Sequence, residues 1–285
     1  MSEAAKDLQG KRILVTGASA GIGKQTALEL ATRGADVIIV GRNAEKTQAA
    51  AEELSRDSGG KVEVMLADLS SVASVRQLAA TFLAKYSSLD VLVNNAGALN
   101  PKRETTIDGY ERTFATNHLA YFLLTELLLP ALRRADHARV VNVSSEAHIM
   151  GRIDFDDLMA ERGYGQWKQY GRSKLANIYF TRELARRVAA DGITVNALHP
   201  GFVASNFLRK GGIYNVLRSM SRVFALDVVG GARTSVYLAS SPDVAGVTGK
   251  YFRKCKERSL RKLAEDDEAA RRLWDASEAL VAAVA

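Results

Sequence analysis

The stretch TGASAGIG, residues 16–23, decides the fold. Its glycines, Gly17, Gly21 and Gly23, follow the run RILV (12–15) and precede KQTALEL (24–30), which has the composition of a helix. Glycine lets a backbone turn tightly and approach a neighbour closely. A helix that begins at such a turn presents free N–H groups and the positive end of its dipole, which suits a phosphate. We therefore expect a strand, a phosphate-binding turn and a helix; a plain tight turn is the alternative.

Short β-branched runs alternate with longer helical patterns along the chain. The expected strands cover 12–16, 36–40, 62–67, 89–94, 139–144, 193–198 and 250–252. The expected helices cover 22–33, 44–56, 72–86, 108–134, 164–190 and 229–240. Most strand runs are apolar throughout, as in a parallel sheet that is covered on both faces. The alternation predicts an α/β fold, a Rossmann-type doubly wound parallel sheet of about seven strands with helices on both faces.

The composition is that of one globular domain. The chain has 285 residues, of which 47% are hydrophobic and 25% charged, and it contains no Pro-rich or Ser/Gly-rich linker. We therefore expect a single domain over 1–285. The net charge is +7, but Lys and Arg are scattered without interleaved aromatic residues, so we expect no nucleic-acid partner. Binding of an anionic cofactor would account for the positive net charge.

The sequence contains no signal for export or membrane insertion. The first ten residues lack the apolar core of a signal peptide, and the longest apolar stretch, 119–132, is interrupted and too short to span a bilayer. The single cysteine, Cys255, excludes an internal disulfide and suits a reducing compartment. The four histidines form no pair with metal-ligand spacing. We expect a cytoplasmic protein without a transmembrane segment or a metal.

Polar and glycine residues gather where the expected strands end. In a doubly wound sheet, ligands bind beyond the carboxyl ends of the strands. Besides the glycine turn, these ends carry Gly41-Arg42, Asp68-Leu69, NNAG (94–97), Ser144-Ser145 and His199-Pro200-Gly201. The sequence therefore predicts a ligand site along this edge.

Tyr170 and Lys174 are four residues apart in the expected helix 164–190, so they share one face. A free tyrosine, with a pKa of roughly 10, is a poor acid or base at neutral pH, and a nearby ammonium would lower that pKa. Together with Ser145 at the end of the preceding strand, the pair predicts proton exchange with an alcohol or a carbonyl. An exposed helix face is the alternative for the Tyr-Lys spacing alone.

These elements together resemble the classical short-chain dehydrogenase/reductase family. The matching elements are TGxxxGxG (16–23), NNAG (94–97), Asn117, Ser145, YGRSK (170–174) and Pro200-Gly201, and they follow the family's order across nearly the whole chain. Three further stretches are similar to the retinol dehydrogenase-like branch of the family. They are NVSS (142–145) with Ala147-His148, GKYF (249–252) and LWDAS (273–277).

The resemblance implies a catalytic set of Asn117, Ser145, Tyr170 and Lys174. Ser145 would bond the substrate oxygen and hold it against Tyr170, while Ser144 would face the other way because strand side chains alternate. Asn117 would hold a water that links Lys174 to solvent. An amide that only packs helices together is the alternative for Asn117.

The resemblance also implies which residues contact a dinucleotide. They are Gly17, Ser19, Gly21, Ile22, Gly23, Arg42, Asp68, Leu69, Asn95, Ala96, Gly97, Tyr170, Lys174, Pro200, Gly201, Val203 and Ser205. Asp68 would bond the adenine amine, with a helix N-cap as the alternative. Ser205 stands where the family usually has threonine, and its hydroxyl can still bond the nicotinamide carboxamide. Asn94 would stabilise the sheet.

The end of the second expected strand indicates NADP(H) rather than NAD(H). NAD-selective sites place an acidic side chain there to bond the ribose 2′-hydroxyl. This strand ends in GRN (41–43), and Arg42 can offer a planar, charged fork to a 2′-phosphate. Lys24 or Arg12 would assist. A solvated turn residue is the alternative for Arg42.

The expected function is an NADP(H)-dependent oxidoreductase that interconverts an alcohol and its carbonyl. Residues 202–229 form an apolar insertion, which we interpret as a lid that selects hydrophobic or aromatic aldehydes and ketones; a helical pair over the core is the alternative. A catalytically silent dinucleotide sensor and a nucleotide-sugar epimerase are alternative functions. The resemblance implies a homodimer or homotetramer assembled through the helices 108–134 and 164–190.

Overall fold

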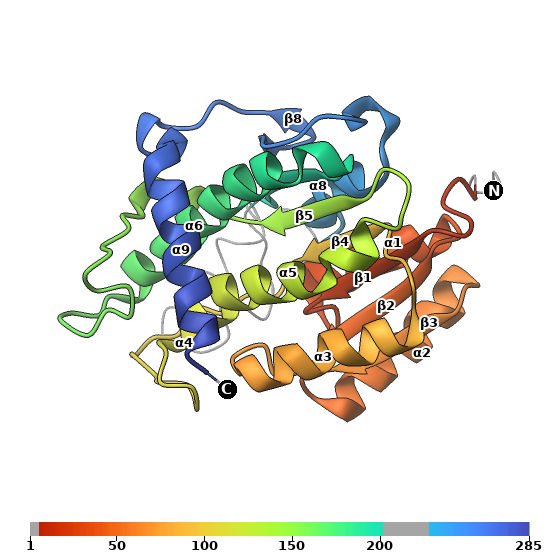
Figure 1. Cartoon of the computed structure of the whole chain (residues 1–285). Coiled ribbons are helices and arrows are strands. Elements are labelled where there is room, and N and C mark those ends of the chain that lie inside the picture. Colours follow the sequence, from red (N-terminus) through yellow and green to blue (C-terminus); the bar gives the residue numbers. More distant parts are fainter. Residues whose placement is uncertain (1–5, 202–227, 285) are drawn as a thin grey trace, which may run out of the picture.

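The computed structural model describes residues 6–201 and 228–284 (Figure 1). Its eight-stranded sheet has the order β3-β2-β1-β4-β5-β6-β7-β8. The strands are β1 Arg12–Thr16, β2 Asp36–Gly41, β3 Val62–Leu66, β4 Val91–Asn94, β5 Arg139–Val143, β6 Thr194–His199, β7 Tyr251–Arg253 and β8 Lys256–Glu257. Strands β1 to β7 are parallel, and β8 is antiparallel to β7. The predicted Rossmann-type doubly wound sheet is confirmed, with β8 as an unexpected eighth strand.

Helices cover both faces of this sheet (Figure 1). The α-helices are α1 Gly21–Thr32, α2 Ala44–Ser58, α3 Val72–Lys85, α4 Arg112–Phe114, α5 Ala120–Leu132, α6 Gln166–Arg187, α8 Val228–Ser240 and α9 Asp267–Ala282. The shorter helices are η1 Ala115–Leu119, η2 Glu146–Met150, η3 Ala189–Asp191, η5 Pro242–Val244 and η6 Lys262–Glu265. One core lies under α3, α5, α6 and α9, and the other under α1, α2 and α8.

The strands form because their side chains supply both cores at once. In β1, Leu14 belongs to the core under α5 and α6, whereas Ile13 and Val15 belong to the core under α1 and α8. All three are fully buried. Burial of one such side chain stabilises the fold by about 1.5–3 kcal/mol. A continuous apolar run is therefore what this position in the sheet requires.

The helix expected over 108–134 is divided into three parts. It begins at α4, where the buried Glu111 carboxylate accepts from Thr113 N and Phe114 N. It continues through the π-helical turn η1 before α5 starts. A π turn adds one residue to the helical repeat, and such turns are frequent at functional sites. Here the turn contains Asn117.

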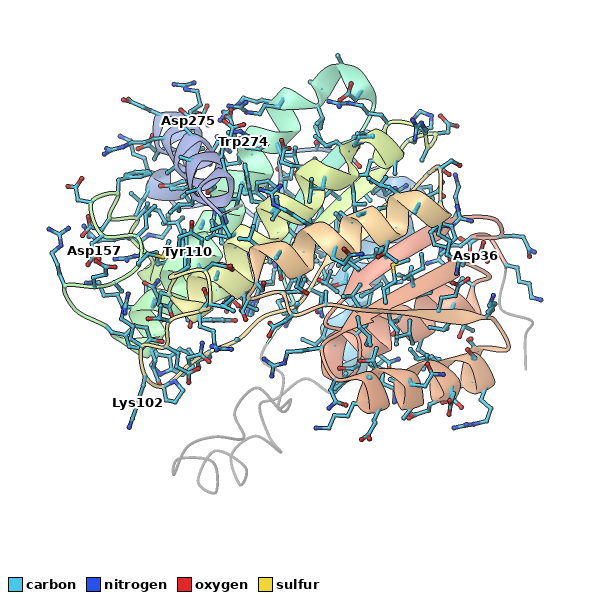
Figure 2. All side chains as sticks on the ribbon, turned by 60° about the horizontal axis from the view of Figure 1, so that its bottom comes forward. Asp36, Lys102, Tyr110, Asp157, Trp274 and Asp275 are labelled. Atoms are coloured by element: carbon cyan, nitrogen blue, oxygen red, sulfur yellow. The ribbon has the colours of Figure 1, made fainter. Side chains whose placement is uncertain are left out.

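Helix α9 was not expected, and it packs across α5 and α6 (Figures 1 and 2). The Trp274 ring lies 4.9 Å from Phe122 and 5.9 Å from Phe180, centroid to centroid. Asp275, next to Trp274 and labelled with it in Figure 2, faces solvent. Part of the face that we expected to form an oligomer is therefore buried against α9. The oligomeric state itself stays a prediction.

The proposed lid, 202–229, lies outside the described residues except for its last two, which begin α8. Val203 and Ser205 lie outside them as well. Within residues 6–201 and 228–284, no helix combines the length and the apolar character needed to cross a membrane.

Candidate active site

The predicted site residues gather at one edge of the sheet. Strand register places the carboxyl ends of neighbouring strands side by side, for example Asn94, which ends β4, beside Asn142, next to the last residue of β5. Figure 2 shows Lys102 and Asp157, in the loops that follow β4 and β5, at the opposite end of the molecule from Asp36, which begins β2. The carboxyl ends of the strands therefore form a single edge beneath these loops.

The glycine turn packs tightly against the end of β4. Gly17 has φ of +67°, and a Cβ on it would lie 2.7 Å from Ala96 Cα. A Cβ on Gly23 would lie 2.4 Å from Asn95 Nδ2. These positions exclude a side chain because the protein's own backbone approaches there. The expected close approach is confirmed, and the neighbour that the structure shows is the NNAG segment.

The start of α1 has no side-chain cap, as is also true of α6, whose N-cap is Gly165. The N-cap of α1, Ala20, makes no side-chain capping bond, and the first turn of α1 contains no acidic residue. By contrast, Asn43 caps α2, Ser71 caps α3 and Asp266 caps α9. Ser19 and Ile22, beside the start of α1, are half-buried. The first N–H groups of α1 are therefore left for an anion.

Asn95 holds the glycine turn in place. Its Nδ2 donates to Thr16 O at 2.8 Å, and Thr16 Oγ1 accepts from Asn95 N at 2.9 Å and from Ala96 N at 3.1 Å. Asn94 Nδ2 donates to Asn142 Oδ1 at 2.9 Å, which confirms that Asn94 stabilises the sheet. The amide of Asn95 is thus used within the protein, and the residue supports the turn from behind.

Arg42 and Asp68 lie together beyond β2 and β3. Arg42 Nη1 is 3.8 Å from Asp68 Oδ2, and the Arg42 side chain is 68% exposed. Asp68 accepts from Ser70 N at 2.9 Å and from Ser70 Oγ at 2.7 Å. Burial raises the pKa of Asp68, but these bonds outweigh it and lower the pKa overall. Ser71 caps α3, so Asp68 is not its N-cap.

The two cations expected to assist Arg42 are engaged elsewhere. Arg12 begins β1, at the opposite end of the strand, where its guanidinium lies 4.3 Å from the centroid of the Tyr86 ring. Lys24 forms an ion pair with Glu53 of α2. The expectation for Arg12 was wrong because Arg12 begins β1, whereas the glycine turn follows the carboxyl end of that strand.

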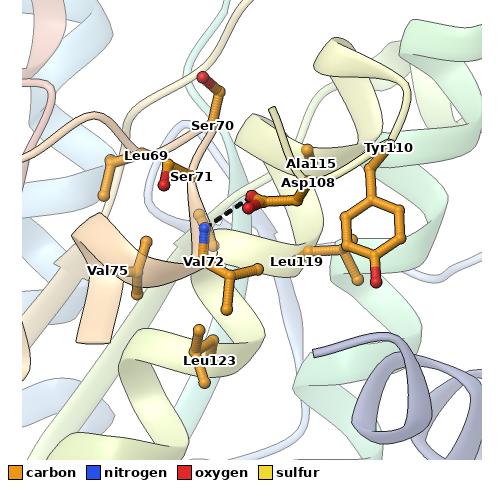
Figure 3. A pocket seen from close by; sticks show the side chains of 11 residues that line it. Leu69, Ser70, Ser71, Val72, Val75, Asp108, Tyr110, Ala115, Leu119 and Leu123 are labelled. Atoms are coloured by element: carbon orange, nitrogen blue, oxygen red, sulfur yellow. Dashed lines mark hydrogen bonds between the residues drawn. The ribbon is translucent and has the colours of Figure 1, made fainter. Parts of the chain in front are cut away.

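A small hollow that is open to solvent lies beside Leu69 (Figure 3). Side chains from the start of α3 and from η1 and α5 line it, and Val72 N donates to Asp108 Oδ2 at 2.8 Å on its wall. Asn117, Ser145, Tyr170 and Lys174 are not among its lining residues. The hollow is therefore separate from the predicted catalytic side chains.

Ser145, Tyr170 and Lys174 come together between β5 and α6. Tyr170 shares a side-chain hydrogen bond with Ser145. Lys174 Nζ donates to Val143 O at 2.9 Å and lies 5.5 Å from the centroid of the Tyr170 ring. Ser144 Oγ donates to Lys174 O at 2.7 Å, so Ser144, which we expected to face the other way, also contacts α6. The structure thus unites the three side chains that the sequence singled out.

The expected lowering of the Tyr170 pKa is not found. Burial raises the pKa of Tyr170 to about 12, against a smaller opposite effect of the Ser145 bond. Burial also lowers the pKa of Lys174 to about 7. Removal from water disfavours both charged forms, and Lys174 directs its Nζ at a backbone carbonyl. The prediction considered the neighbouring charge but could not weigh the burial.

Asn117 has its amide fully engaged. Its Nδ2 donates to Ala98 O at 2.9 Å and to Ser173 Oγ at 3.0 Å, and its Oδ1 accepts from Ala98 N at 2.7 Å. A Cβ on Gly97 would lie 3.5 Å from Lys174 Nζ and 3.6 Å from Asn117 Oδ1. The side chain therefore fixes the chain after β4 against α6. The water expected at Asn117 stays a prediction.

Sequence reasoning missed two side chains that support this arrangement. Ser173 Oγ donates to Tyr170 O at 2.8 Å while it accepts from Asn117. Tyr121 OH donates to Ala96 O at 2.7 Å from beneath the NNAG segment. Helical spacing from Tyr170 could have indicated Ser173; no sequence signal indicates Tyr121.

Pro200 and Gly201 follow β6 at the same edge. Gly201 has φ of +98°, a conformation that favours glycine. Within the described residues, no three His, Cys, Asp or Glu side chains are grouped so that they could hold a metal.

Comparison with known proteins agrees with this geometry. The family described as short chain dehydrogenase matches residues 11–212. Human Retinol dehydrogenase 14 is 44% identical over 292 residues, which cover 96% of this chain and 87% of that protein. Human Retinol dehydrogenase 13 is 44% identical over 282 residues, which cover 96% and 85%.

Solved structures agree as well. A crystal structure of an uncharacterized protein from Mycobacterium paratuberculosis superposes with a TM-score of 0.78, at 36% identity over 97% of this chain and 95% of that one. A blue fluorescent protein from a metagenomic library, in complex with NADPH, gives 0.70 at 31% identity over 86% and 96%.

The chain therefore belongs to the short-chain dehydrogenase family. Within that family it is retinol dehydrogenase-like, as its NVSS, GKYF and LWDAS stretches predicted. It is an oxidoreductase that acts on CH–OH groups and their carbonyls, and the predicted class of cofactor, a nicotinamide dinucleotide, is confirmed by the family.

Proposed function

We propose that the chain is an NADP(H)-dependent reductase of apolar aldehydes and ketones. The observation that carries this proposal is the meeting of Ser145, Tyr170 and the buried Lys174 at the same sheet edge as the start of α1, whose N-cap makes no side-chain bond. The three side chains can exchange a proton with a substrate, and the helix start can bind the phosphates of a dinucleotide.

The reduction needs one hydride and one proton. The bound dinucleotide would supply the hydride to the carbonyl carbon. Tyr170 donates its phenolic proton to the carbonyl oxygen, and Ser145 donates a hydrogen bond to the same oxygen as negative charge develops on it. The product is the alcohol.

The electrostatics of the site favour the donor state of Tyr170. Because burial raises the pKa of this residue to about 12, the phenol carries its proton at neutral pH. Once the proton has left, Lys174, with its Nζ 5.5 Å from the ring centroid, stabilises the phenolate in its charged form. The ammonium effect expected from the sequence thus acts after proton transfer.

The residues of the described edge fit NADP(H). The first N–H groups of α1, which follow the glycine turn and have no side-chain cap, would receive the pyrophosphate. Arg42, largely exposed and not matched by an acid at its own turn, receives the 2′-phosphate. Asp68 beside Arg42 orients the guanidinium.

The names of the relatives indicate the substrate class. Proteins called retinol dehydrogenases, 44% identical to this chain, suggest a long apolar alcohol and its aldehyde. We therefore propose retinal and other hydrophobic aldehydes as substrates. The lid that would select them lies outside the described residues.

Turnover of NADPH with a series of aldehydes tests the proposal. Retinal, long-chain and aromatic aldehydes should be reduced with higher kcat/KM than small polar carbonyls, as followed by loss of NADPH absorbance. Tyr170→Phe is the matched control for background oxidation. Tight NADPH binding without turnover of any carbonyl would instead support the dinucleotide sensor.

A further inference from the structure

Two histidines hold the peptide bond that follows Ser145. The Nδ1 of His148 lies 2.7 Å from Ser145 O, and Glu146 N donates to His199 Nδ1 at 3.2 Å. A carbonyl oxygen can only accept, so His148 carries its proton on Nδ1. An N–H group can only donate, so Nδ1 of His199 is unprotonated and its proton lies on Nε2. His199 is therefore neutral, and the two Nδ1 atoms have opposite roles, as acceptor in His199 and donor in His148.

The Glu146 side chain fixes the tautomer of His199. Glu146 Oε2 is 3.4 Å from His199 Nε2, and Glu146 Oε1 forms an ion pair with Arg253. Both histidines are 5% exposed, and burial lowers the pKa of each, that of His199 to about 4. Other groups that act on them are Arg261 and the Tyr251 ring, 5.0 Å from His148.

These contacts join three strand ends to α6. His199 ends β6, Arg253 ends β7 and Ser145 follows β5. The helix η2, which contains Glu146 and His148, lies directly on α6, since a Cβ on Gly171 would be 2.6 Å from Ala147 O. Gly171 follows Tyr170. The placement of η2 therefore sets how Ser145 meets Tyr170.

We propose that His148 and His199 are positioning residues that fix the 145–146 peptide and thereby aim the Ser145 hydroxyl at the substrate oxygen. The proposal rests on the proposed reductase function. Ser145 Oγ also accepts from Ala147 N at 3.2 Å. Rotation of the 145–146 peptide would change how Ser145 is aligned with Tyr170. The two imidazoles oppose that rotation from both ends of the peptide.

Asparagine and glutamine variants test the proposal as matched pairs. Asparagine places its amide near the position of imidazole Nδ1, whereas glutamine places it near that of Nε2. The side chain of His199→Asn can thus accept from Glu146 N, and that of His148→Asn can donate to Ser145 O. The glutamine side chains cannot do so, although the backbone N of residue 148 still donates to Ser145 O at 3.1 Å. Misplacement of a reacting group by 1 Å can cost about 100-fold. We expect kcat to fall about 10- to 100-fold in His148→Gln and His199→Gln and by less than about threefold in the asparagine variants. KM for NADPH should not change.

A double-mutant cycle shows whether the histidines act through Ser145. In the Ser145→Ala background, His199→Gln and His148→Gln should lower kcat by less than about twofold, because the hydroxyl that they aim is absent. Thermal unfolding and NADPH fluorescence show that each variant is folded and binds cofactor. Each histidine tests the proposal separately, so one variant that fails to fold leaves the other pair decisive.

The outcomes separate the two proposals. A parent protein that binds NADPH but reduces no carbonyl would overturn the reductase function and this inference with it. An active parent whose glutamine and asparagine variants lose equal activity, or whose losses add fully to that of Ser145→Ala, would overturn the inference and leave the function standing.

Discussion

The two halves of the site edge differ in how far their polar groups are buried and bonded to other protein atoms. Beyond β1 to β3, the start of α1 is uncapped and the Arg42 side chain is 68% exposed. Beyond β4 to β6, Asn117 and Lys174 are buried and bonded to protein atoms, as are both histidines beside Ser145. The first half is left open for a large anionic ligand, and the second half is fixed before a substrate arrives.

This difference predicts different consequences of mutation. A buried group with fixed partners stabilises a transition state because it need not reorganise during the reaction, so its loss should lower kcat. An exposed group contributes about one charged hydrogen bond, so its loss should lower cofactor affinity by a modest factor. The following experiments can break or sharpen the distinction.

Tyr170→Phe should show the largest effect. The ring keeps its packing, but the proton donor is lost, so kcat for carbonyl reduction should fall about 100- to 10,000-fold. NADPH binding, measured by fluorescence, should stay within about twofold of the parent value. Lys174→Ala, by contrast, should lower both kcat and NADPH affinity. A Tyr170→Phe enzyme with more than about a tenth of the parent rate would show that another group donates the proton.

The glycine turn should show the next largest effect. Gly23→Ala places a Cβ 2.4 Å from Asn95 Nδ2, and such overpacking costs about 1–3 kcal/mol. We expect a lower Tm and weaker NADPH binding, measured by thermal unfolding with and without cofactor. Gly163→Ala is the matched control, because no atom lies within 4 Å of its added Cβ. Equal Tm and NADPH affinity in the two variants would show that the turn adapts freely.

The sequence predicted this edge well because its evidence is local. Buried parallel strands need apolar runs, and the glycine and Tyr-Lys spacings survive in the structure at the places expected. Helix α9 was predictable too: its buried residues, among them Ala270, Leu273, Trp274, Ser277 and Val281, follow helical periodicity. The histidine contacts beside Ser145 could not be predicted, because they depend on how the ends of β5 and β6 lie side by side. The raised pKa of Tyr170 depends on burial, which no spacing reveals.

Arg42→Ala tests the first half of the site edge, which is left open for an anionic ligand. Loss of one charged pair with a phosphate, about 1.5–3 kcal/mol, should reduce the preference for NADPH over NADH in kcat/KM by tenfold or more. Steady-state kinetics with both cofactors measure the effect. Lys24→Ala removes the same charge from a side chain that already pairs with Glu53, and it should leave the preference unchanged. If the parent uses NADH as well as NADPH, Arg42 is not the selector.

His118 should show the smallest effect, on stability alone. This residue is buried beneath α9, with Nε2 2.9 Å from Ser277 Oγ, and burial lowers its pKa to about 4. In the unfolded chain it has the ordinary value of 6.5. As the pH falls below 6.5, His118 becomes protonated in the unfolded chain but stays neutral in the folded protein. The free energy of unfolding therefore decreases until the pH reaches about 4.

His118→Gln isolates this contribution from those of His148 and His199, whose lowered pKa values act in the same direction. Between pH 7 and pH 5.5, the parent should lose about 1 kcal/mol more free energy of unfolding than the variant, as measured by urea unfolding at each pH. Activity at pH 7 should be unchanged, because His118 contacts α9 and Asn177 rather than the catalytic side chains. Equal pH dependence in parent and variant would mean that His118 takes up its proton in the folded state as well. The second half of the site edge, beyond β4 to β6, would then accommodate a buried charge more readily than its burial implies.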